Sequence, residues 1–163
     1  MLIRLLLIVL VVGAVGVFTG TIKPQEIIDR PKEVIERVTP PTGAERVYLR
    51  MVDGNFERLD AVGNIVFSCD PNTNPGACRA SLAQLIRQMR VFQGELRRAD
   101  VPASLRAAHR LLTRAIDRGI AGLRLAQRGL ASHRRRDFMR ALAMLQGAAR
   151  LLDRAEGELD RQR

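Results

Sequence analysis

Apolar residues recur with heptad-like spacing along three segments of the chain. Within residues 82–99, 105–130 and 138–159, the apolar positions step alternately by three and four residues. Spacing of this kind places one apolar stripe of each helix toward a shared core. We therefore predict three long amphipathic helices that pack against one another.

Residues at the ends of these segments predict where the helices begin and end. Pro102, which follows Asp100, is expected to open the helix over 105–130, because proline suits a first turn. Gly129 is expected to end that helix, and Ser132 to cap the next one.

The segment 45–67 permits two interpretations. An Asp53-Gly54-Asn55 sequence between apolar runs is typical of a β-hairpin turn. A helix is favoured, because an isolated hairpin is marginally stable and nothing else in the chain reads as a strand. The helical stripe would consist of Tyr48, Val52, Leu59, Val62 and Val66. The predicted fold class is all-α, with an antiparallel bundle of about four helices over residues 44–163.

Residues 5–22 form an uncharged, apolar stretch at the start of the chain. At roughly 1.5 Å per residue, these 18 residues would make a helix of about 27 Å, close to the thickness of a membrane core. We predict that residues 1–22 form a transmembrane anchor; a cleaved signal peptide is the alternative, with Ala14-Val15-Gly16 as its cleavage site. The spacing of Gly13, Gly16 and Gly20 would allow two anchors to pair in a homodimer.

A proline-rich spacer, residues 23–43, follows the predicted anchor. It contains a tandem heptad, because residues 24–30 and 31–37 both begin with proline and end with arginine. Lys23, Lys32 and the nearby arginines would favour a cytoplasmic domain by the positive-inside rule. We nevertheless predict a cell-membrane protein with an extracytoplasmic domain, because its cysteines favour an oxidising compartment.

Cys69 and Cys78 flank a turn-rich loop between the first two predicted helices. In an exported protein two such cysteines are expected to form a disulfide; in a cytosolic protein they would be free thiols. Their spacing does not suit a structural zinc site, so neither a metal nor a cofactor is predicted. His109 falls on an apolar stripe, where we expect a core-edge histidine with a hydrogen-bond partner or, alternatively, a ligand or pH-sensitive contact.

Positive charge is concentrated in the middle of the predicted bundle. Residues 79–140 hold 15 arginines and four acids, a balance of +11, while the rest of the chain holds 12 basic and 13 acidic residues, a balance of −1. Six arginines fall on one side of the third helix, opposite its apolar stripe: Arg106, Arg110, Arg114, Arg118, Arg124 and Arg128. Two interpretations stay open: a solvated face in an arginine-rich chain, or a contact with an anionic lipid surface or cell-wall polymer.

The segment 102–112 and the alanine- and leucine-rich helix from Phe138 resemble bacterial proteins that carry one membrane anchor and a helical outer domain. The resemblance covers about residues 44 to 160. It implies an extracytoplasmic helical domain and implies no activity.

Catalytic motifs are absent from the sequence, which holds no H-E-x-x-H, no G-x-S-x-G and no phosphate-binding glycine loop. No stacking aromatic residues accompany the arginines, which disfavours nucleic-acid binding. We therefore predict a non-enzymatic, membrane-tethered interaction or structural module of the cell envelope. The alternative function is a small-molecule-sensing extracytoplasmic bundle.

Overall fold

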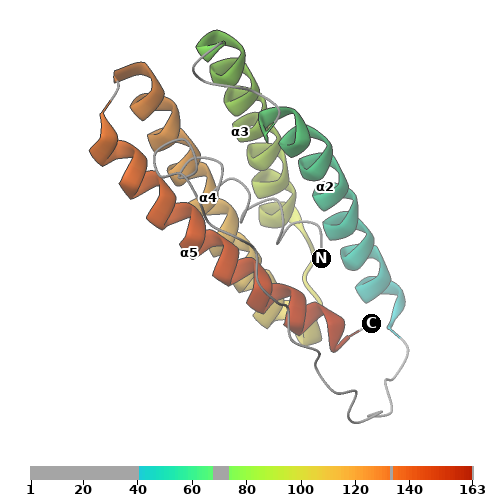
Figure 1. Ribbon diagram of the computed structural model, residues 1–163. Helices are drawn as coiled ribbons and strands as arrows, with labels where there is room; N and C mark the ends of the chain where they lie inside the picture. The colour runs from blue at the N-terminus through green and yellow to red at the C-terminus, as the bar shows by residue number, and fades with distance from the viewer. Residues whose placement is uncertain (1–40, 68–73, 133, 163) are drawn as a thin grey trace, which may run out of the picture.

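The computed structural model describes residues 41–67, 74–132 and 134–162, and all regular elements in these ranges are helical (Figure 1). The prediction of an all-α fold with four long helices is confirmed for this part of the chain. The elements are α2 (Gly43–Phe67), α3 (Pro75–Arg98), the short 3₁₀ helix η1 (Ala103–Leu105), α4 (Arg106–Ser132) and α5 (Arg135–Asp160).

The segment predicted as either helix or hairpin is helix α2, which runs through Asp53-Gly54-Asn55 without a break. Asn55 is only 3% exposed, and its amide donates a hydrogen bond to the carbonyl of Met51, one turn earlier, at 2.8 Å. The same amide donates to the Glu95 carboxylate of α3 at 2.5 Å. A residue that is typical of turns is therefore used here as a buried link between two helices.

Helix α2 begins with a capping box that the sequence analysis missed. The Thr42 hydroxyl accepts a hydrogen bond from the Glu45 amide at 3.3 Å, and the Glu45 carboxylate accepts one from the Thr42 amide at 2.6 Å. Because the T-x-x-E pattern satisfies two helix-terminal amides reciprocally, it marks a helix start. The helical domain thus begins at Thr42, inside the predicted spacer of residues 23–43.

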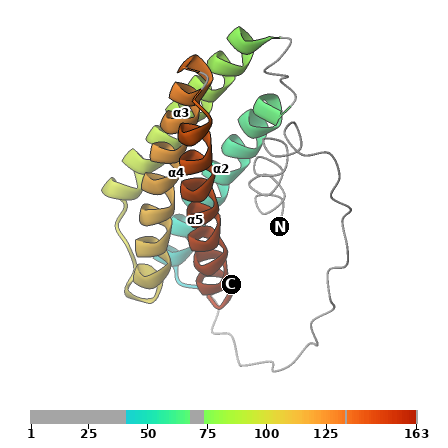
Figure 2. The same cartoon turned by 60° about the vertical axis from the view of Figure 1, so that its left-hand side comes forward.

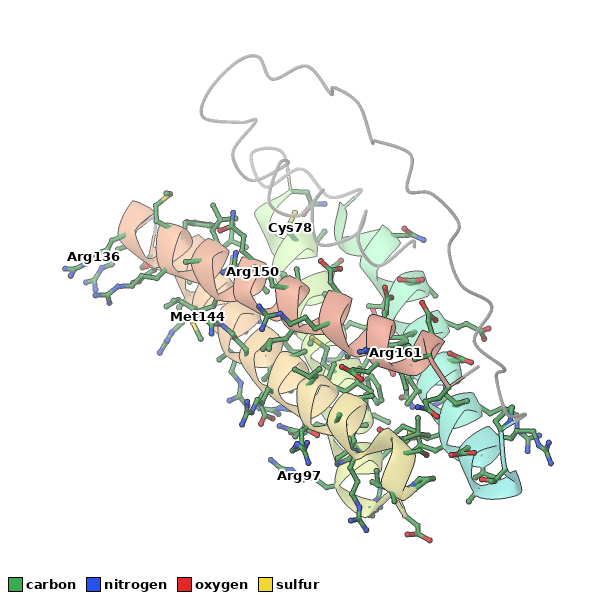
Figure 3. The ribbon with its side chains drawn as sticks, turned by 90° about the horizontal axis from the view of Figure 1, so that it is seen from below. Cys78, Arg97, Arg136, Met144, Arg150 and Arg161 are labelled. Atoms are coloured by element: carbon green, nitrogen blue, oxygen red, sulfur yellow. The ribbon has the colours of Figure 1, made fainter. Side chains whose placement is uncertain are left out.

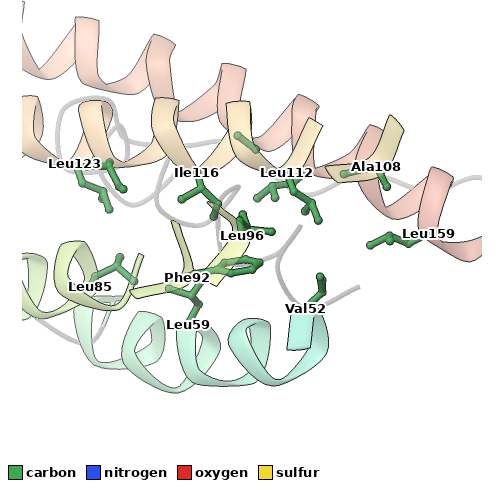
Figure 4. Packing of buried hydrophobic residues seen from close by; sticks show 14 of the residues in the cluster. Val52, Leu59, Leu85, Phe92, Leu96, Ala108, Leu112, Ile116, Leu123 and Leu159 are labelled. Atoms are coloured by element: carbon green, nitrogen blue, oxygen red, sulfur yellow. The ribbon is translucent and has the colours of Figure 1, made fainter. Parts of the chain in front are cut away.

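The helices pack mainly against their neighbours in sequence, and α4 and α5 form the most extensive pair (Figures 1 and 2). The core draws on all four helices, as the close view shows (Figure 4). Its largest fully buried side chains are Phe92, Leu96, Leu105, Leu112, Ile116, Leu123, Leu159 and Val52.

Glycines allow α4 and α5 to approach closely. A Cβ atom at Gly122 would lie 3.0 Å from Leu145 and 3.3 Å from the backbone oxygen of Ala141 on α5. Gly129 is buried against the ring of Phe138, so the prediction that Gly129 ends the helix is wrong. A buried glycine can serve either a helix end or a close helix contact, and here it serves the contact.

The prediction that Ser132 caps the fourth helix is also wrong. Ser132 is the last residue of α4, and its hydroxyl donates to the carbonyl of Arg128 at 2.9 Å. Arg134 precedes α5 and makes no side-chain capping bond. The Pro102 prediction is closer, because Pro102 immediately precedes η1, which leads directly into α4.

Candidate functional site

Six arginines of α4, which we call the arginine face, lie on the side of the helix that faces solvent. Arg106, Arg110, Arg114, Arg118, Arg124 and Arg128 are all exposed. The buried residues of α4, such as Leu112 and Ile116, lie on its opposite side, against the other helices. The structure thus places these six residues on one surface, as the periodicity predicted.

No member of the arginine face forms an ion pair within the described ranges. The ion pairs found there are Arg58–Glu95, at 3.7 Å, and Arg161–Glu158, at 2.5 Å. Asp117 is the one acid of α4, and its carboxylate accepts a hydrogen bond from the Gln93 amide of α3. Within the described residues, the positive charge of the arginine face is therefore not neutralised by an ion pair with a carboxylate.

Exposed arginines of α3 and α5 extend the positive charge beyond α4. Arg97 projects from α3 and Arg136 from α5, and Arg150 lies farther along α5 (Figure 3). The exposed arginines described on α3 and α5 are Arg79, Arg87, Arg90, Arg97, Arg98, Arg136, Arg140, Arg150 and Arg154. Arg150 and Arg154 were not among the predicted residues, because acidic neighbours on α5 cancel their charge in a count along the sequence.

Arg118 joins the arginine face to α5. Its guanidinium lies directly over Gly147, where a Cβ atom would come within 2.6 Å of Arg118 Cζ. The absence of a side chain at Gly147 therefore lets Arg118 lie across the α5 backbone. Sequence reasoning could not find this contact, because it depends on the register between two helices.

An open hollow interrupts the arginine face at Ala121. Arg124, Gln127 and Arg128 complete its lining, and all four residues belong to α4. The small side chain of Ala121 leaves this space on the exposed side of the helix. None of the three polar side chains has a hydrogen-bond or ion-pair partner in the described part of the chain.

His109 has the hydrogen-bond partner that its position predicted. The Tyr48 hydroxyl of α2 lies 3.0 Å from His109 Nδ1, and the two rings meet edge to face. Burial lowers the pKa of His109 below its usual range and raises the pKa of Tyr48. Both shifts favour the neutral forms at neutral pH, so the pair acts as a polar link between α2 and α4. The ligand or pH-sensitive role of His109 stays a prediction.

The remaining predicted sites fall partly or wholly outside the described residues. Cys78 is 2% exposed and is not a free thiol, but Cys69 lies outside the described ranges, so their pairing stays a prediction.

Gly13, Gly16, Gly20 and the predicted anchor of residues 1–22 also lie outside the described ranges. In the part that is described, no helix has both the length and the apolar character needed to cross a membrane. The same ranges contain no group of three or more side chains arranged to hold a metal ion.

Comparison with known proteins gives no relative for this chain: no family model, no curated protein and no solved structure matches it.

Proposed function

We propose that the protein is a non-enzymatic module, tethered to the cell membrane by residues 5–22, whose arginine face contacts an anionic surface. The observation that carries this proposal is the row of six exposed arginines on α4, none of which has an ion-pair partner in the described ranges.

The length of the arginine face favours an extended partner over a compact ligand. Arg106 and Arg128 are 22 residues apart on one helix, which corresponds to about 33 Å at roughly 1.5 Å per residue. Each arginine near an anionic leaflet contributes up to about 1 kcal/mol, which salt screens beyond roughly 8 Å at physiological ionic strength. Several arginines acting together would therefore bind a charged surface in a salt-sensitive way.

The proposed location is the outer side of the cell membrane, with the Cys69–Cys78 disulfide stabilising the loop between α2 and α3. The buried position of Cys78 near the start of α3 suits such a bond. Protease treatment of intact cells tests this placement, because an outside domain is degraded and a cytoplasmic one is protected. Protection of the domain would refute it.

Binding to anionic vesicles tests the arginine face. The domain of residues 41–163 should sediment with phosphatidylglycerol vesicles at low salt and be released at high salt. Arg110→Gln with Arg114→Gln should weaken this binding, because two charges of the face are removed.

The matched control is Arg46→Gln with Arg50→Gln on α2. This pair has the same i,i+4 spacing and the same change in net charge, and both residues are exposed. Equal losses in the two variants would mean that net charge alone drives binding. That result, or absence of low-salt binding by the unmodified domain, would refute the role of the arginine face.

A further inference from the structure

We propose that the hollow at Ala121 is a phosphate-binding site, in which Arg124 and Arg128 hold a single phosphate group. The site rests on the proposed function, because it belongs to the arginine face, and it adds a defined contact to a diffuse attraction. The ligand class is a phosphate carried by a lipid headgroup or free in solution.

The donors around the hollow match a phosphate better than a carboxylate. Arg124, Gln127 and Arg128 line one side of a single helix turn. Two guanidinium groups and one amide together present more N–H donors than the two oxygens of a carboxylate accept. A phosphate offers additional acceptor oxygens, and planar guanidinium groups bind it through paired hydrogen bonds.

The hollow combines open space with donors that have no partner in the described residues, unlike the neighbouring Arg118. Arg118, one turn before it, lies over Gly147 of α5. Asp117, which precedes Ala121 by one turn, is hydrogen-bonded to Gln93. The nearest acid of α4 is therefore engaged with α3, and Arg124 and Arg128 form no ion pair within the described ranges.

Binding of small soluble probes to the full chain in a neutral maltoside detergent tests the site. The probes are inorganic phosphate, dihexanoyl phosphatidylglycerol and, as a carboxylate control, acetate, each titrated by calorimetry. Arg124→Gln with Arg128→Gln should weaken phosphate-probe binding by about tenfold or more, the loss expected when charge-assisted hydrogen bonds are removed. Ala121→Leu, which fills the hollow without changing the charge, should weaken it as well.

The matched control on the same helix is Arg106→Gln with Arg110→Gln, which removes two charges at the same spacing but leaves the hollow intact. Preferential loss in the Arg124/Arg128 and Ala121 variants supports the site. Binding of the lipid probe alone identifies a headgroup phosphate, and binding of inorganic phosphate identifies a free phosphate.

Three results would overturn the site: no binding of either phosphate probe, equal binding of acetate, or equal losses in the two arginine pairs. If the two arginine pairs lose probe binding equally but the domain still binds vesicles in a salt-sensitive way, the proposed function is retained and only the site is discarded. Absence of vesicle binding by the unmodified domain at low salt would refute the proposed function itself.

Discussion

Replacing Gly122 by alanine tests how closely α4 and α5 approach. The added Cβ would lie 3.0 Å from both Cγ and Cδ2 of Leu145 and 3.3 Å from the backbone oxygen of Ala141. Leu145 is only 2% exposed, so its side chain has little room to move aside. The Ala141 oxygen belongs to the α5 backbone, and relieving that contact requires the helices to separate.

Two opposing effects set the expected change in the free energy of unfolding for Gly122→Ala. Alanine is about 1 kcal/mol more favourable than glycine in a helix interior. Overpacking a well-filled core costs about 1–3 kcal/mol. The net expectation for Gly122→Ala is a lower free energy of unfolding, by up to about 2 kcal/mol.

Gly54→Ala on α2 isolates the helix-propensity term. A Cβ at Gly54 would meet no atom within 4 Å, so this variant should be more stable by about 1 kcal/mol. The difference between the two variants, about 1–3 kcal/mol, is then the overpacking cost alone. Gly147→Ala should fall between them, because the Arg118 side chain that it displaces is flexible and exposed.

Urea unfolding of residues 41–163, followed by far-UV circular dichroism, measures all three variants. A free energy of unfolding for Gly122→Ala that rises as much as that for Gly54→Ala would refute the close packing of α4 on α5. Equal m-values across the series would show that the denatured state is unchanged, so that the comparison is valid.

Three further predictions concern the links that hold the helices together. Because burial lowers the pKa of His109, the unfolded chain takes up a proton before the folded chain as the pH falls. The free energy of unfolding should therefore decrease as the pH is lowered through about 6.5. A His109→Gln variant whose free energy of unfolding has the same pH slope would contradict this. Thr42→Ala should lower the free energy of unfolding by about 1 kcal/mol through loss of the α2 capping box, whereas Thr42→Ser, which keeps the hydroxyl, should have little effect in the same urea assay. If the predicted Cys69–Cys78 bond is present, a reductant should lower the free energy of unfolding by about 2–3 kcal/mol. A Cys78→Ser control should melt at the same temperature with and without reductant, and the same result for the unmodified chain would refute the bond.

The sequence predicted the helices well because each one has an apolar stripe of the correct period. Leu82, Phe92 and Leu96 of α3 and Leu112 and Leu123 of α4 are buried as their spacing required. Periodicity decides which face of a helix is buried, and it is insensitive to the exact end of the helix.

The helix ends were harder to predict, because glycine and serine have more than one structural use. Gly129 was expected to end α4 but lies inside it, where Phe138 of α5 packs against it. Conversely, the Thr42 and Glu45 pair is a recognisable start signal that the preceding prolines obscured. These ends depend on which neighbour fills the space beside each residue, and that information is not local in the sequence.

The candidate site was predicted in part, for a similar reason. The exposed side of α4 follows from its periodicity, so all six arginines were placed on one surface. The contact of Arg118 with Gly147, the hollow at Ala121 and the arginines of α5 depend on side-chain conformations or on neighbouring helices. Only the contact of Arg118 with Gly147 requires α4 to be packed on α5, because the hollow is lined by residues of α4 alone.

Helix electrostatics distinguish the arginines of α4 from those of α3. Arg97 and Arg98 occupy the last turn of α3, where a positive charge interacts favourably with the helix dipole. Arg106 instead occupies the first turn of α4, where the same dipole disfavours positive charge, and no acid in that turn offsets it. The stability of α4 therefore does not account for Arg106, whereas the stability of α3 does account for Arg97 and Arg98. Arg106→Gln should therefore raise the free energy of unfolding by about 0.3–1 kcal/mol in the urea assay, and an unchanged or lower value would contradict this reasoning.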